Sequence, residues 1–172
     1  LGACAVFTYR AWPSLYTLVD DAYISARYSS HLAHGLGLTY STGEPAIEGY
    51  TNFLWTILLG IGLFLGGPVV EIMVFSGLIF GWIALGACVL LARELSPKNA
   101  YAGYVAPLIF AFSPHFAVAA TNGLESSMFV AAVVITLWAC TSVAHHGVAG
   151  RQMTFDHQAR DRRRRVEMSG QR

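Results

Sequence analysis

Hydrophobic positions in this chain gather into four long uncharged runs. Three of them, at 72–92, 100–121 and 126–144, contain 21, 22 and 19 residues. A helix that crosses a bilayer needs about 20 predominantly apolar residues, so each of these runs predicts a membrane span. The fourth run, at 53–66, has 14 residues. That length favours a re-entrant or interfacial helix over a span.

Polar positions concentrate ahead of these runs, in the stretch 20–52. Asp20 or Asp21 is placed to cap the start of a helix, and Gly35 is placed to end it. One face of that helix carries, at helical spacing, Asp20, Ile24, Arg27 and His31. Turn-forming residues follow the helix and predict a loop. The whole pattern therefore predicts an all-α, multi-pass transmembrane bundle with a helical polar loop.

Composition supports a membrane protein. Hydrophobic residues make up 55% of the chain and charged residues 12%, whereas soluble domains are about 25% charged. The 13% aromatic content argues against disorder, because disordered chains are rich in charge and poor in aromatic residues. Three widely separated cysteines without a CxxC pair argue against a disulfide framework or a zinc site; they are Cys4, Cys88 and Cys140.

The charged residues are unevenly distributed. Residues 1–150 contain four basic and seven acidic side chains, and 151–172 contain seven arginines and three acids. The chain is therefore a slightly acidic body, 1–145, followed by a basic tail, 146–172, that we predict to be cytoplasmic and disordered. Because the basic residues are not spread over a folded face, the pattern argues against a nucleic-acid partner.

Basic residues also predict the orientation in the membrane. Arg93 and Lys98 lie between the first two long runs, so the positive-inside rule places that loop in the cytoplasm. The segment 122–125 then falls outside. If 53–66 is re-entrant, the polar loop 20–52 is outside as well, and if 53–66 spans the membrane, the start of that loop is cytoplasmic. The length of 53–66 favours the first arrangement.

Small residues recur at four-residue spacing within the apolar runs. Gly62 and Gly66 form one pair, and Gly77 and Gly81 form another. Glycines at this spacing let two helices approach closely. They predict close helix packing and say nothing specific about function.

Four charged residues of the body are candidates for chemistry. Asp20 and Asp21 could deprotonate a hydroxyl or bind a divalent cation, or they could simply stabilise the start of a helix. Glu125 lies between two predicted spans, where an ionisable residue is often functional, although it could also belong to a helix cap. Arg27, followed by Tyr28, could bind a phosphate or pair with one of the aspartates.

Considered together, the segments around these charged residues resemble the first and second outer loops of GT-C type membrane glycosyltransferases. The likeness is to actinobacterial terminal arabinofuranosyltransferases and their bacterial relatives, and it covers roughly 1–145. The segments that carry it are Asp20-Asp-Ala-Tyr-Ile-Ser-Ala-Arg-Tyr28, His34-Gly-Leu-Gly-Leu38, Glu48-Gly-Tyr-Thr-Asn-Phe-Leu-Trp55, Ser113-Pro114 and Asn122-Gly-Leu-Glu125.

The resemblance implies transfer of a sugar from a polyprenyl-phosphate donor to a glycan, lipid or protein acceptor on the outer face of the bacterial inner membrane. It implies Asp20 as general base with Asp21 as its neighbour, and Glu125 as the acid that completes the site. It implies Arg27, with Tyr28, near the donor phosphate. Residues implied for the substrate pocket are Glu48, Tyr50, Asn52 and Trp55. Because the family continues through further spans, we expect this chain to be an N-terminal part.

Two other classes of protein fit the membrane pattern. A small multi-pass transporter would use its acids as ion sites near the bilayer midplane. Here the acids lie in predicted loops, except Glu71 and Glu94, which flank a span. A non-catalytic membrane protein would explain the glycine spacings but not a 33-residue polar loop, which is longer than a connector needs.

Overall fold

The structure is a computed structural model, and it describes residues 1–43, 47, 49, 51–99 and 101–145. Glu48, Tyr50 and the tail 146–172 lie outside the described residues. The regular elements of the described ranges are all helical, as predicted. In chain order they are α1 (Gly2–Ala11), η1 (Trp12–Ser14), α2 (Asp20–Ala33), α3 (Phe53–Phe64), α4 (Val69–Leu95), α5 (Ala102–Phe112), α6 (Pro114–Ala119) and the helix Ser126–His145.

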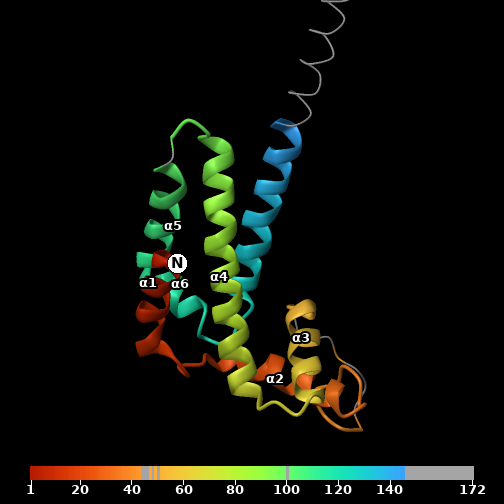
Figure 1. Ribbon diagram of the computed structural model, residues 1–172. Helices are drawn as coiled ribbons and strands as arrows, with labels where there is room; N and C mark the ends of the chain where they lie inside the picture. Colours follow the sequence, from red (N-terminus) through yellow and green to blue (C-terminus); the bar gives the residue numbers. More distant parts are fainter. Residues whose placement is uncertain (44–46, 48, 50, 100, 146–172) are drawn as a thin grey trace, which may run out of the picture.

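The longest helix, α4, forms the axis of the fold. Its 27 residues extend about 40 Å at 1.5 Å per residue, and α5 and Ser126–His145 run alongside it (Figure 1). α2 and α3 gather near the end of α4 at which that helix begins (Figure 1). By length and composition, α4 and Ser126–His145 are each able to cross a membrane. α3, at 12 residues, is about 18 Å long and shorter than the hydrocarbon core.

The apolar run 100–121, predicted as one span, is divided into two helices. α5 ends at Phe112 and α6 begins at Pro114, with Ser113 in an extended conformation between them. Proline lacks a backbone N–H and disfavours helical geometry at the residue before it. The Ser113 hydroxyl then caps α6 by accepting a hydrogen bond from the Phe116 N–H at 3.3 Å. Counting apolar residues alone missed this break.

The polar helix α2 also starts differently from the prediction. Val19 occupies the N-cap position of α2 and makes no capping hydrogen bond with its side chain, so neither Asp20 nor Asp21 caps the helix. Both aspartates lie in the first turn, where carboxylates interact favourably with the helix dipole. At the other end, Gly35 has a φ of +75° just after the last helical residues, which agrees with the predicted helix end.

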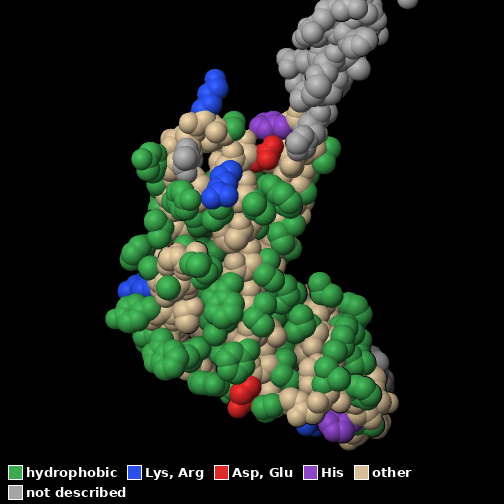
Figure 2. All heavy atoms as spheres, in the orientation of Figure 1, with side chains coloured by type: hydrophobic (Ala, Val, Ile, Leu, Met, Phe, Trp, Pro, Cys, Tyr) green, Lys and Arg blue, Asp and Glu red, His purple; other side chains and the backbone are tan. Residues whose placement is uncertain are grey.

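Two buried hydrophobic clusters hold the helices together. The larger one joins α1, α4, α5 and α6, with the Phe7 and Phe116 rings 5.2 Å apart between centroids. The smaller one joins α2, α3 and α4 through Ala22, Trp55 and Met73. On the face drawn in Figure 2, hydrophobic side chains cover the sides of the bundle, and most charged side chains lie toward its two ends. That distribution suits a protein surrounded by lipid.

Two glycines of α4 allow close approach of other segments, as their spacing predicts. A Cβ on Gly77 would collide with the backbone carbonyl of Ala120, and a Cβ on Gly81 would collide with the ring of Phe7. Glycine is needed at these positions because the neighbouring segments occupy the space of a side chain. The contacts fix α1 and the end of α6 against α4.

Candidate functional site

A polar cavity opens where α2, α3 and the loop before Ser126–His145 meet. Its volume is about 210 Å³. It contains two carboxylates from distant parts of the sequence, Asp21 of α2 and Glu125 of the loop. The residues that line it are Asp21, Ile24, Ser25, Gly49, Thr51, Asn52, Leu124 and Glu125.

Asn52 is the centre of the hydrogen bonds in this cavity. Its side-chain amide donates to Glu125 Oε2 at 2.8 Å and to Ser25 Oγ at 2.9 Å. Its Oδ1 accepts from the hydroxyls of Ser25 and Thr56, both at 3.2 Å. A hydrogen bond to a charged group is stronger than one between neutral groups. Asn52 therefore orients the Glu125 carboxylate while it is itself held by α2 and α3.

Two further hydrogen bonds attach the loop that carries Glu125 to the residue before α2 and to α3. The Val19 N–H donates to the Asn122 carbonyl at 3.1 Å. The buried Trp55 side chain donates from Nε1 to the Gly123 carbonyl at 3.0 Å. Three residues of the short segment before Ser126–His145 thus contact the residue before α2, the residue before α3, and Trp55 within α3. This arrangement defines where Glu125 lies.

Gly123 is needed in this segment for two reasons. Its φ is +86°, a conformation that residues with a Cβ rarely adopt. A Cβ at this position would also lie 2.7 Å from the Cβ of Ala22 and 2.9 Å from Cδ2 of Leu18. The absence of a side chain therefore lets the loop pack directly against the start of α2.

The structure brings together three of the predicted site residues, Asp21, Asn52 and Glu125. Asp20 is exposed and does not line the cavity. Trp55 is fully buried beneath the loop, and it does not line the cavity either. Asp21, like Asp20, is exposed at its position in the first turn of α2. Both aspartates are therefore equally exposed by class, and the difference between them is that Asp21 lines the cavity and Asp20 does not.

Arg27 and Tyr28 of α2 donate hydrogen bonds to backbone carbonyls of the loop that follows α2. Arg27 is exposed, and its Nε donates to the Tyr40 carbonyl at 3.1 Å. The Tyr28 hydroxyl donates to the Ile47 carbonyl at 2.8 Å. Within the described ranges, the ion pair between Arg27 and an aspartate that the sequence allowed is not formed. Neither residue lines the acidic cavity.

Sequence reasoning missed Ser25 as a site residue. The face of α2 that it selected ran through Asp20 and Arg27, whereas the cavity is lined by Asp21 and Ser25. These two are four residues apart and so share a face of the helix. If the helical face had been counted from Asp21 instead of Asp20, Ser25 would have been predicted to share that face.

The described part of the chain holds no group of three or more His, Cys, Asp or Glu side chains placed to bind one metal ion. Mg²⁺ is commonly bound by one or two carboxylates together with substrate phosphates. Asp21 and Glu125 are the described residues of the cavity that could take part in such a site. Asp20, the other predicted candidate, lies outside the cavity lining.

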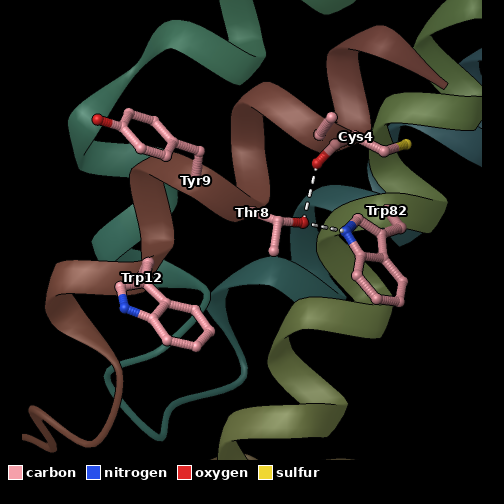
Figure 3. A pocket seen from close by; sticks show the side chains of 6 residues that line it. Cys4, Thr8, Tyr9, Trp12 and Trp82 are labelled. Carbon is pink, nitrogen blue, oxygen red and sulfur yellow. Dashed lines mark hydrogen bonds between the residues drawn. The ribbon is translucent and has the colours of Figure 1, made fainter.

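A second kind of cavity lies between α1 and α4 and is apolar. Two adjoining spaces of about 400 and 560 Å³ share Thr8, Trp12 and Trp82 in their linings. Trp82 Nε1 donates to the Thr8 hydroxyl at 3.1 Å, and that hydroxyl donates to the Cys4 carbonyl at 2.9 Å (Figure 3). No carboxylate or histidine is among the described residues that line either space. This region can therefore hold an apolar group.

Comparison with known proteins finds similarity to a curated enzyme. The chain is 29% identical over 140 residues to terminal beta-(1->2)-arabinofuranosyltransferase of Mycobacterium tuberculosis, a match that covers 77% of this chain and 22% of that enzyme. The chain thus spans about a fifth of the length of the curated relative it matches. No family model and no solved structure matches the chain. The similarity supports a distant relationship to glycosyltransferases.

Proposed function

We propose that this chain forms the catalytic-loop portion of a GT-C type membrane glycosyltransferase. The observation that carries the proposal is the meeting of Asp21 and Glu125 in one polar cavity. Each acid comes from a segment that resembles an outer loop of such enzymes. The distant similarity to an arabinofuranosyltransferase and the two helices able to cross a membrane support the same function.

Asp21 is the general base in this proposal. Among the described residues its carboxylate has no hydrogen-bond partner, so its oxygens are free to accept a proton from an acceptor hydroxyl. As that proton moves to Asp21, the acceptor oxygen forms a bond to the anomeric carbon of the donor sugar. The bond from that carbon to the phosphate oxygen breaks, and its electron pair leaves with the lipid phosphate. A positioned base of this kind contributes about 10²–10⁴-fold in rate.

Glu125 has a different role because one of its oxygens is already engaged by Asn52. The oriented carboxylate can accept hydrogen bonds from sugar hydroxyls across the cavity. A fixed carboxylate also holds the donor or acceptor at one angle, and correct orientation is a large part of the rate of a two-substrate reaction. Asn52 is a positioning residue in this scheme.

A lipid-linked donor is supported by the cavity between α1 and α4. Its apolar lining suits an isoprenoid chain. Leu15 is one of the lining residues and comes shortly before α2, the helix that carries Asp21, so the apolar cavity is connected to the acidic one through a short segment of chain. Arg27 keeps its two terminal nitrogens unpaired among the described residues, since its hydrogen bond to Tyr40 is made by Nε. Those nitrogens can bind the phosphate of the donor.

An outer-face location is supported by the arrangement along α4. Met73, near the start of α4, packs against residues of α2 and α3 beneath the acidic cavity. Arg93 lies in the last turn of the same helix, with Lys98 just beyond it. The positive-inside rule puts that basic end in the cytoplasm, and the acidic cavity is then outside, facing the cell envelope.

The test compares two neighbouring aspartates with the same change of charge. Asp21→Asn and Asp20→Asn are each made in the product of the intact gene, in membranes. Transfer to an acceptor is measured from polyprenyl-phosphate sugars, beginning with arabinofuranose. Asp21→Asn is expected to lower kcat about 10²–10⁴-fold with little change in KM, and Asp20→Asn is expected to stay within a few-fold of the parent. Full activity of Asp21→Asn, or equal losses in the two variants, would contradict the assignment.

A further inference from the structure

A third cavity lies at the opposite end of α4 from the acids. It has a volume of about 390 Å³ and is formed by the last turn of α4, the turn that follows, and the start of α5. Its lining residues are Arg93, Ser96, Pro97, Asn99 and Tyr104. None of them has a role in the proposed transfer reaction. The cavity is therefore open to a separate function.

Arg93 is held in this cavity without an acidic partner. Its guanidinium carbon lies 5.8 Å from the centre of the Tyr104 ring, which is a cation–π distance. Its stem lies across Gly103, where a Cβ would be 2.9 Å from Cγ and 3.1 Å from Nε of the arginine. Within the described ranges, the Arg93 side chain makes no ion pair or hydrogen bond. The side chain is thus positioned by packing, and its donors remain available.

The carboxylate nearest in sequence, Glu94, is engaged elsewhere. Glu94 Oε1 lies 3.0 Å from Nδ1 of His145 in the last described helix. Glu94 is not among the residues that line the cavity. The positive charge of Arg93 is therefore not neutralised within the space that it faces.

The other polar groups of the lining are hydrogen-bond donors. Asn99 Oδ1 accepts the Tyr101 N–H at 3.0 Å, which leaves the Asn99 amide nitrogen to donate. Ser96 and Tyr104 each contribute a hydroxyl. A guanidinium with several neutral donors and no carboxylate is the set of groups that binds a phosphate oxyanion. Lys98, exposed in the same turn, adds to the attraction for an anion.

We propose that the cavity lined by Arg93, Ser96, Asn99 and Tyr104 binds a phosphate group. Its position at the end of an apolar 27-residue helix corresponds to the depth of lipid headgroups, where basic residues attract anionic lipids. An anionic phospholipid is the source that this position favours. The apolar stem of Arg93 and the Tyr104 ring would then border the glycerol region of the lipid.

The test measures lipid binding to the purified 172-residue chain in a non-ionic detergent by native mass spectrometry. The ligands are phosphatidylglycerol and diacylglycerol with the same acyl chains, which lacks the phosphate. Arg93→Gln is compared with Arg10→Gln, a matched change at an exposed arginine of α1 outside the cavity. Arg93→Gln is expected to weaken phosphatidylglycerol binding about tenfold, the loss of one charge-assisted hydrogen bond. Arg10→Gln and the parent are expected to bind it equally.

Each outcome bears on the phosphate site. Equal phosphatidylglycerol binding by Arg93→Gln and the parent would overturn the proposal, as would equal losses in the two arginine variants or equal affinity for diacylglycerol. Inorganic phosphate is added as a competitor. Displacement at millimolar concentration supports the site with a free phosphate as ligand, and no displacement supports it with a lipid headgroup. If Arg93→Gln does not fold, Ser96→Asp, which adds a carboxylate to the lining, must give the same tenfold loss.

Discussion

Replacing Gly123 by alanine tests whether the loop of Glu125 is held as tightly as the structure indicates. The new Cβ would lie 2.7 Å from the Cβ of Ala22 and 2.9 Å from Leu18. The residue would also have to keep a φ of +86°. Two separate costs therefore act at one position, a backbone cost and a packing cost.

The two costs can be separated with Gly35, which has a similar backbone and no close neighbours. Its φ is +75°, and nothing lies within 4 Å of the position that a Cβ would take. A left-handed conformation costs an alanine about 1–2 kcal/mol, and overpacking costs about 1–3 kcal/mol more. Gly35→Ala should therefore lower the free energy of unfolding by about 1–2 kcal/mol. Gly123→Ala should lower it by about 2–5 kcal/mol.

The assay is unfolding in a mild detergent by titration with sodium dodecyl sulphate, followed by helical circular dichroism. Sugar transfer by the same variants is measured in membranes, where Gly123→Ala should lose activity because Glu125 moves away from Asn52. Gly35→Ala should keep its activity. Equal loss of stability in the two variants would show that the loop is free to move, and the reasoning about its attachment would be wrong.

Four further substitutions test other contacts. Trp55→Phe removes the N–H that binds the buried Gly123 carbonyl, and unfolding titrations should show a loss of about 1–3 kcal/mol; no loss would mean that this hydrogen bond does not secure the loop. Gly77→Ala should destabilise the chain by about 1–3 kcal/mol through overpacking. Gly86→Ala, in open space on the same helix, should stabilise it by about 0.5–1 kcal/mol, and the reverse order would contradict the packing. Asn52→Ala should lower kcat about tenfold by releasing Glu125, and an unchanged kcat would remove its positioning role.

The helical class and the longest helices were predictable because they depend on local composition. An apolar run without charges can satisfy its backbone in lipid only as a helix. α4, Val69–Leu95, contains the predicted 72–92 segment, and Ser126–His145 contains 126–144. Their ends extend beyond the apolar runs, because the helical backbone continues into residues such as Arg93 that are polar.

The division of 100–121 was not predicted, although its cause is local. Hydropathy counts Ser113 and Pro114 only as two residues in an apolar run. The backbone restriction that proline places on the preceding residue has no hydropathy value. A rule that ends helices before proline would have found the break, but the same rule would wrongly have ended α5 at Pro107, which lies inside that helix.

The sequence singled out Glu125 and the pair Asp20–Asp21 but gave Asp20 the leading role, whereas Asp21 is the aspartate that lines the cavity. The contacts that connect these acids were not predicted. Asp21 and Glu125 stand out in the sequence because charges are scarce in an apolar chain. The choice between Asp20 and Asp21 depends on the rotation of α2 about its axis, which is set by contacts such as Ala22 with Gly123. The bond from Asn52 to Glu125 joins residues that are far apart in the chain. No local pattern encodes such a pairing.

The relation between the two acids depends on the packing of the whole bundle. Asp21 and Glu125 are brought to one cavity by the loop, and the height of that loop along α4 is set where Ala120 lies against Gly77. From that contact the chain reaches Asn122, whose carbonyl accepts the N–H of Val19 just before α2. The geometry of a polar site is thus determined by an apolar helix contact beneath it. A substitution at Gly77 should therefore reduce sugar transfer as well as stability, even though Gly77 does not line the cavity.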